Sequence, residues 1–80
     1  MNIEHFLQKI SEQFESTDVS QIVPETEFKL LEEWSSMHAL LIIALIDAEY
    51  NVPFSGEDLQ NCNTISDIYN TVQIRMLHND

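Results

Sequence analysis

Turn-forming residues are scarce in this chain, and their scarcity is the strongest constraint on its fold. Glycine occurs once and proline twice in 80 residues, so few positions favour the tight turns that join β-strands. Apolar side chains recur instead at the helical spacing of three and four residues. The first stripe at this spacing consists of Ile3, Phe6, Leu7, Ile10 and Phe14. The sequence therefore predicts an all-α fold.

A long connection follows this stripe, over residues 16–34. Pro24 disfavours helix in the residue before it, so we expect no main helix here. A structureless loop of this length is unusual in a small domain, and its apolar content predicts that it packs over the core. The apolar side chains concerned are Val19, Ile22, Val23, Phe28, Leu30 and Leu31.

The second main helix is predicted from Ser35 or Ser36 to about Tyr50. Serine is a favoured N-cap because its hydroxyl accepts a hydrogen bond from an otherwise unpaired backbone N–H group. Asn51 and Pro53 then end the helix. A complete core stripe lies on one side of it: Ala39, Ile42, Ile43, Ile46 and Tyr50.

One short helix and one further main helix complete the prediction. The short helix is expected over residues 57–60. Thr64 then caps the last helix, and Asp67 three residues later is an acidic relative of the capping box. The core stripe of that helix is Ile65, Ile68, Tyr69, Val72 and Met76. Residues 1–80 are thus expected to form a single domain, an all-α four-helix bundle with three main helices, one short helix and a long first loop.

The net charge of the chain limits the kinds of partner that it can bind. Fourteen Asp and Glu residues stand against Lys9, Lys29 and Arg75, which gives a net charge of −11. We expect no nucleic-acid partner, because affinity for phosphates comes from Lys and Arg. An acidic surface favours docking on basic patches of partner proteins instead. So short a chain buries only a modest core and leaves little room for a catalytic pocket, so we expect that it is not an enzyme.

Membrane insertion is not expected, because the longest apolar run, residues 39–46, is too short to span a bilayer. The first residues do not form a basic and apolar leader, and a single cysteine, Cys62, provides no disulfide framework. We therefore expect a cytoplasmic monomer. No metal site is predicted, since Cys62 and the three histidines, His5, His38 and His78, lack the spacing of zinc ligands.

The second main helix has another apolar face, opposite its core stripe. That face consists of Met37, Leu41, Ala44 and Ala48. Two interpretations remain open. The long loop covers this face, and the helix is buried on both sides. Alternatively, the face is an exposed strip that another protein covers.

The start of the same helix resembles the modification site of acyl carrier proteins. Their pattern is Asp-Ser-Leu or Asp-Ser-Met at the start of the second helix. Here Ser36 and Met37 match the serine and the apolar residue after it, and Trp34 precedes them as in some members. An apolar-Pro loop at residues 52–53 and a Thr-Ile pair at residues 64–65 also fall where the family has similar features. The likeness extends over nearly the whole chain.

The resemblance implies that Ser36 carries 4′-phosphopantetheine through a phosphodiester. It also implies a carrier that holds acyl or aminoacyl groups as thioesters on this arm. Its partners would be a phosphopantetheinyl transferase and the enzymes that load and transfer the acyl group. An exposed hydroxyl at a helix start suits this role, since a helix N-terminus tolerates a phosphate. The outward face of the helix would dock the partners: Met37, Leu41, Ala44 and Ala48.

Two departures from the family pattern affect this interpretation. Ser35 replaces the Asp, which in the family caps the helix and helps to engage the modifying enzyme. Leu41 and Ala48 occupy positions that are acidic in fatty-acid carriers. Both departures favour a specialised pathway over housekeeping fatty-acid synthesis. They also motivate an alternative, a carrier-like module that binds proteins and is never modified, in which Ser36 is an ordinary residue at the helix start.

A hydrolase built on Ser36 is disfavoured. The nearest base in the sequence is His38, and residues two positions apart on a helix do not face each other. We expect His38 to be a solvated residue on the flank of the helix or a contact for the arm. Glu32 and Glu33 are expected to supply acidity near the start of the helix.

Overall fold

The computed structural model describes residues 2–77, which form helices and connections without any strand. The helices, in order, are α1 (Ile3–Ser11), the 3-10 turns η1 (Val19–Gln21) and η2 (Phe28–Leu30), α2 (Ser36–Tyr50), α3 (Gly56–Gln60) and α4 (Ile65–Leu77). The predicted all-α bundle of three main helices, one short helix and a long first loop is confirmed. The predicted bounds of the second main helix agree with those of α2.

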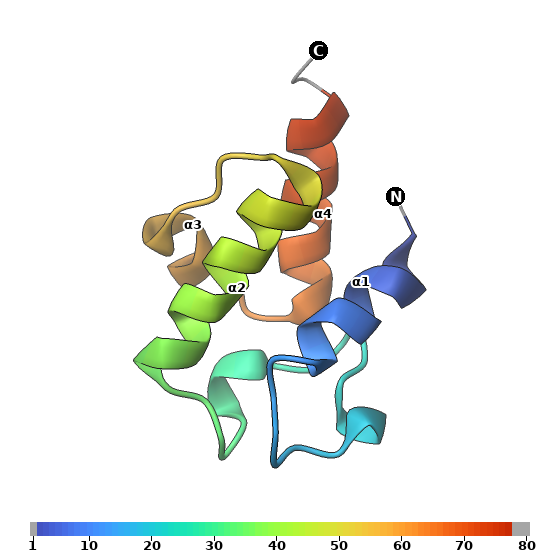
Figure 1. Ribbon diagram of the computed structural model, residues 1–80, viewed down its shortest axis with the longest axis vertical. Coiled ribbons are helices and arrows are strands. Elements are labelled where there is room, and N and C mark those ends of the chain that lie inside the picture. Colours follow the sequence, from blue (N-terminus) through green and yellow to red (C-terminus); the bar gives the residue numbers. More distant parts are fainter. Residues whose placement is uncertain (1, 78–80) are drawn as a thin grey trace.

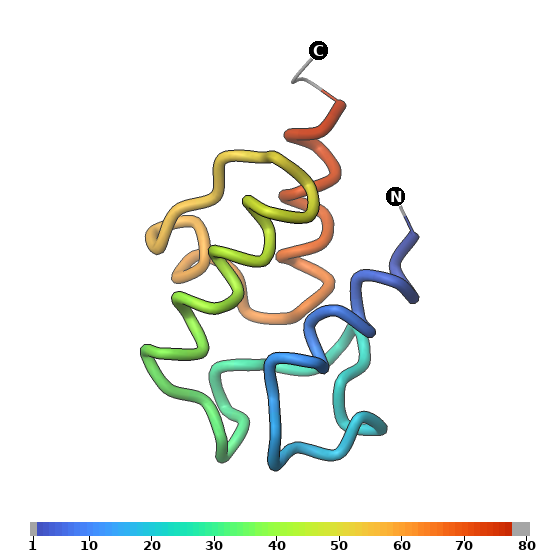
Figure 2. The backbone as a smooth tube through the Cα atoms, viewed as in Figure 1, coloured from blue at the N-terminus to red at the C-terminus, as the bar shows by residue number. Residues whose placement is uncertain are grey.

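The helices surround a central α2. This helix contacts α3 on one side and α4 on the other, and α1 contacts α4. In Figures 1 and 2 the connection between α1 and α2 crosses the bottom of the bundle, below the last turn of α1 and the first turn of α4. Within residues 2–77, the helices are too short or too polar for any of them to cross a bilayer.

The core draws side chains from every α-helix and from the connections. Its fully buried members are Phe6, Ile10, Phe28, Ile42, Ile46, Val52, Ile65, Ile68 and Val72. Most of them belong to the predicted stripes. Met76 does not, because it is 37% exposed near the end of α4; the predicted stripe of the last helix is wrong at this residue.

Helix α1 is shorter than its apolar stripe. It ends at Ser11, and the backbone N–H of Phe14 donates to the Ser11 carbonyl at 3.0 Å in a turn that follows the helix. Phe14 is nevertheless buried. The prediction that its spacing reflects a continuous helix is wrong, because a turn brings the ring back to the core.

The long connection contributes to the core through only some of its apolar residues. Ile22 and Phe28 are buried and Leu31 packs against the core, whereas Val19, Val23 and Leu30 are exposed. The loop therefore packs over the core as predicted, but through Ile22, Phe28 and Leu31 alone among its six apolar residues. A 3-10 turn separates Phe28 and Leu30 onto different sides, so one ring enters the core and the leucine faces solvent.

The connection is also tied to the helices through its backbone. The N–H groups of Ile65 and Ser66 at the start of α4 donate to the carbonyls of Thr26 and Pro24, at 3.1 and 2.9 Å. The first N–H groups of a helix have no partner inside the helix, so the connection satisfies two of them. Its position is fixed by α4 as much as by the apolar core.

The ends of the helices follow the predicted capping chemistry. Thr64 Oγ1 accepts from the Asp67 N–H at 3.1 Å, and the Asp67 carboxylate accepts from the Thr64 N–H at 3.0 Å. Ser55 and Asp58 form the same capping box at α3. Helix α2 ends at Asn51, which adopts the left-handed conformation with φ of 52°, a conformation that Asn tolerates better than most residues.

Phe28→Ala is expected to destabilise the protein by about 3–5 kcal/mol, because it removes a fully buried ring and leaves a cavity. Leu30→Ala is the matched control, since Leu30 lies in the same 3-10 turn and is 77% exposed; its effect is expected within about 0.5 kcal/mol. Urea denaturation followed by circular dichroism measures both. Equal effects of the two substitutions would show that the connection does not contribute to the core as described.

Candidate functional site

Ser36 is the first residue of α2 and is exposed. The N-cap is Ser35, whose Oγ accepts from the backbone N–H of His38 at 3.4 Å. Of the two serines considered from the sequence, Ser35 therefore caps the helix. Within residues 2–77 the Ser36 hydroxyl has no hydrogen-bond partner, so it is available for chemistry with another molecule.

His38 is not the solvated flank residue that the sequence suggested. Its ring stacks on Phe14, with centroids 4.8 Å apart and 19° between the planes. Its Nδ1 lies 2.9 Å from Ser35 Oγ, and its Nε2 lies 3.4 Å from a carboxylate oxygen of Glu33. Stacking and hydrogen bonding hold the ring beside the cap and away from solvent. No Ser36–His38 pair forms among the described residues, as the spacing predicted.

An aromatic cluster supports the start of α2. Trp34 packs edge-on against Phe28 at 5.1 Å and stacks on Phe14 at 6.3 Å, and it also contacts the His38 ring at 6.2 Å. These four residues come from η2, the turn after α1, the segment before α2 and α2 itself. The cluster places Trp34 as a packing residue that covers the start of α2.

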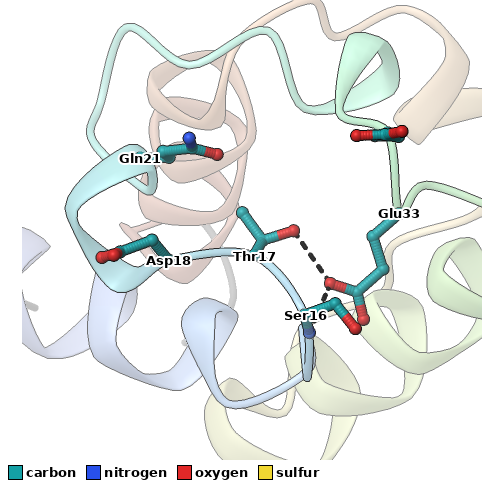
Figure 3. A pocket seen from close by; sticks show the side chains of 6 residues that line it. Ser16, Thr17, Asp18, Gln21 and Glu33 are labelled. Carbon is teal, nitrogen blue, oxygen red and sulfur yellow. Dashed lines mark hydrogen bonds between the residues drawn. The ribbon is translucent and has the colours of Figure 1, made fainter.

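Glu33 closes the long connection into a loop. Its carboxylate accepts hydrogen bonds from the backbone N–H groups of Glu15 and Ser16 at 2.8 and 2.9 Å, and from Thr17 Oγ1 at 2.8 Å. Figure 3 shows this carboxylate pointing at Ser16 and Thr17. Partial burial acts to raise the pKa of the Glu33 carboxyl, but the hydrogen bonds it accepts outweigh that effect and lower the pKa below its ordinary value. The Glu33 carboxylate, which we expected to supply acidity near the start of the helix, thus accepts the hydrogen bonds that hold the loop.

The hollow drawn in Figure 3 does not include Ser36. It has a volume of about 380 Å³ and is lined by Ser16, Thr17, Asp18, Gln21, Glu32 and Glu33. Its polar side chains bond mainly to the loop itself, as Asp18 does through the N–H of Ser20 at 2.9 Å. This hollow is part of the loop structure and lies apart from the serine.

A second hollow includes Ser36. It is a groove of about 480 Å³ between α2, α3 and η2, lined by Lys29, Trp34, Ser36, Ala39, Leu40, Ile43, Gly56, Leu59 and Gln60. Most of its lining is apolar. The sequence did not predict it, because its walls come from three segments whose relative placement depends on the tertiary fold.

The outward face of α2 is exposed. Met37 is 66% and Leu41 is 38% exposed, and Ala44 and Ala48 are exposed beside them. Leu40, at 68%, adds to this face although the sequence analysis did not include it. The long connection lies below the helix and leaves the face uncovered. The interpretation in which the loop buries this face is wrong.

Metal binding finds no support within the described residues, where no cluster of His, Cys, Asp and Glu is arranged to hold an ion. Cys62 is buried, and burial raises the pKa of its thiol, so it behaves as a small apolar residue of the core. His78, which the sequence analysis considered, lies outside the described residues.

Comparison with protein families gives a match over most of the chain. A family model described as a phosphopantetheine attachment site matches residues 5–72. The chain belongs to this family. Comparisons with curated proteins and with solved structures gave no match. The carrier is thus a phosphopantetheine-binding domain, the kind of domain to which 4′-phosphopantetheine is attached covalently.

The start of α2 fits this group. An exposed hydroxyl at the first helical residue can reach the active site of another enzyme, and the N–H groups of the first turn favour the negative charge of a phosphodiester. When attached, the group supplies a thiol on a long arm, on which a cargo can be held as a thioester. The carrier's own residues present the exposed Ser36 hydroxyl, and the Ser35 cap and the aromatic cluster hold the start of α2 in place.

Glu33→Gln is expected to lower the stability of the carrier at neutral pH. The variant is also expected to lose less stability than wild type when the pH is lowered. A carboxyl whose pKa is lowered on folding stabilises the fold above its unfolded pKa, and this contribution disappears as the pH falls through the folded pKa. Thermal melts between about pH 5 and pH 2 compare the two proteins. Glu32→Gln, a neighbouring exposed carboxylate outside these bonds, is the control. Parallel curves of melting temperature against pH for wild type and Glu33→Gln would contradict the stabilising role assigned to the Glu33 carboxylate.

Proposed function

We propose that the carrier bears its 4′-phosphopantetheine arm on Ser36 and holds acyl or aminoacyl intermediates as thioesters on it. The observation that supports this most strongly is the exposed, unpartnered Ser36 hydroxyl at the first residue of α2, within the region matched by the family. Ser35 takes the capping role and leaves Ser36 free. The Ser36 oxygen attacks the pantetheine-side phosphorus of coenzyme A and becomes the ester oxygen of the phosphodiester. The pyrophosphate bond of coenzyme A breaks, adenosine 3′,5′-bisphosphate leaves, and the serine proton passes to the transferase.

The partners that follow from this role are a phosphopantetheinyl transferase and enzymes that load and remove the cargo. They must bind close to Ser36, since the tethered thioester has to enter their active sites. The outward face of α2 begins directly after Ser36 and exposes Met37, Leu40 and Leu41. An apolar face of this kind supports docking of partners of a specialised pathway, because fatty-acid carriers present acidic residues at comparable positions.

A second function is supported by the same face. Ser35 occupies the position of the family's Asp, and an exposed apolar strip can serve a protein-interaction module that is never modified. The two functions differ in a measurable way. The protein purified from its own host bears a pantetheine mass increment if it acts as a carrier, and none if it acts as an interaction module.

Ser36→Ala is expected to abolish loading by a phosphopantetheinyl transferase with coenzyme A, because it removes the accepting oxygen. Ser35→Ala is the matched control: it removes the neighbouring hydroxyl and weakens the cap by about 1 kcal/mol, but it leaves the accepting oxygen. Intact-protein mass spectrometry counts the arms on each variant. An adduct that persists in Ser36→Ala and disappears in Ser35→Ala would move the attachment to Ser35.

Leu41→Glu is expected to weaken the cognate partner enzyme while leaving the melting temperature nearly unchanged. A buried leucine contributes roughly 1.5–3 kcal/mol, which corresponds to about 10- to 150-fold in affinity. Ile74→Glu is the control, since Ile74 is an exposed apolar residue on α4 and lies outside the proposed face. Titration calorimetry measures the affinities. Equal affinity for both variants would place the docking surface elsewhere.

A further inference from the structure

The groove beside Ser36 differs in charge from the rest of the carrier. The chain contains 14 acidic and three basic residues, yet the described residues that line this groove include Lys29 and no Asp or Glu. Ser36 lies in the same groove. A molecule tethered to Ser36 can therefore meet a positive charge there without passing an acidic side chain of the lining.

Lys29 also differs from the other two cations. Arg75 forms two hydrogen bonds to the Asp58 carboxylate, at 2.7 and 2.8 Å, and Lys9 lies 3.5 Å from Glu49. Within residues 2–77, Lys29 has no carboxylate within ion-pair distance. Its charge is the one that the described fold does not neutralise with an acid.

The contacts of Lys29 place its ammonium group at the groove and leave it donors to spare. The Nζ donates to the Gln60 carbonyl at 2.9 Å and lies 5.7 Å from the centroid of the Phe28 ring. A lysine ammonium has three N–H donors, so the bond to Gln60 leaves two. Gln60 is the last residue of α3, which means that the charge sits at the end of α3 that borders the groove.

The apolar lining strengthens the effect of this charge. Ala39, Leu40, Ile43 and Leu59 form much of the wall, and a charge beside apolar groups is screened less than one in open water. A tethered molecule with an apolar stem and an anionic group matches the groove, because the stem contacts the apolar wall and the anion contacts Lys29. A neutral, wholly apolar molecule would leave the ammonium without a counter-charge.

We propose that Lys29 is an anion-binding residue that holds a negatively charged group of the molecule tethered at Ser36. The anion is a phosphate or a carboxylate: either the phosphodiester of the arm or a carboxylate at the free end of an acyl cargo. This inference rests on the proposed attachment at Ser36. Lys29 then selects which tethered molecules the groove retains, and it acts on binding without taking part in any covalent step.

The test compares acyl groups that differ only at their end. A transferase loads wild-type carrier with the pantetheine arm alone, with the butyryl arm and with the succinyl arm, from the corresponding coenzyme A compounds. Lys29→Met and Lys29→Arg are loaded in the same way. Lys9→Met is the control, since it removes the same charge from α1. Mass spectrometry first verifies loading: absence of an adduct on wild type contradicts the proposed function and is distinguished from any result on Lys29.

The melting temperature of each loaded form is compared with that of the same variant before loading. A single charge contact near a protein surface corresponds to a shift of about 1–8 °C in a chain of this size. If the cargo carboxylate is bound, the succinyl form of wild type melts higher than the butyryl form, and Lys29→Met removes the difference. If the phosphodiester is bound, Lys29→Met reduces the shift equally for all three arms. Lys29→Arg and Lys9→Met keep the wild-type pattern in both cases.

Identical shifts in wild type and Lys29→Met for all three arms would overturn the proposal. A measurement on the unchanged chain covers the case in which Lys29→Met does not fold. The backbone amide signals of Leu59 and Gln60 are expected to move on loading, and to move back when salt screens the contact. Amide signals of α3 that are insensitive to loading and to salt would also overturn it.

Discussion

The packing of four aromatic rings at the bottom of the bundle is the contact on which the site depends. Phe14, Phe28, Trp34 and His38 come from four different segments, and their centroids lie 4.8 to 6.3 Å apart. Aromatic pairs at such distances gain energy beyond the area they bury. Because His38 belongs to the first turn of α2 and Trp34 lies just before it, these rings fix where α2 starts. The position of Ser36 follows from that.

Hydrogen bonds to the Glu33 carboxylate also hold the segment before α2 in place. Glu33 accepts from the backbone after α1 and lies beside His38, so it joins the first and last parts of the long connection. A connection of this length carries many backbone polar groups, and those that leave water need partners. The Glu33 carboxylate and the first turn of α4 provide them. The loop is therefore a structural element that supports the start of α2, where Ser36 lies.

The three cations of the chain differ in their partners. Arg75 and Lys9 are each paired with an acid of another helix. The hydrogen bond from Arg75 is the largest cause that holds the pKa of the Asp58 carboxyl well below its ordinary value. Lys29 lines the groove at Ser36, and it also lines a smaller hollow together with Glu27. In a chain with a net charge of −11, a cation that has no acidic partner among residues 2–77 is where we propose that an anion from outside is accommodated.

The sequence by itself determined the main helices, the Thr64 cap of α4 and a serine cap at the start of α2, although it left open whether Ser35 or Ser36 forms that cap. These features depend on local chemistry: the spacing of apolar residues, the Ser35 cap, and the reciprocal bonds of Thr64 with Asp67 all act within a few residues. The sequence could not decide which apolar residues of the connection are buried, that Phe14 enters the core after its helix has ended, or that His38 stacks on it. Only the tertiary structure decided these points, and it also created the groove with Lys29 at its edge. Such contacts join residues far apart in the chain, and whether a side chain is covered depends on which distant segment packs over it.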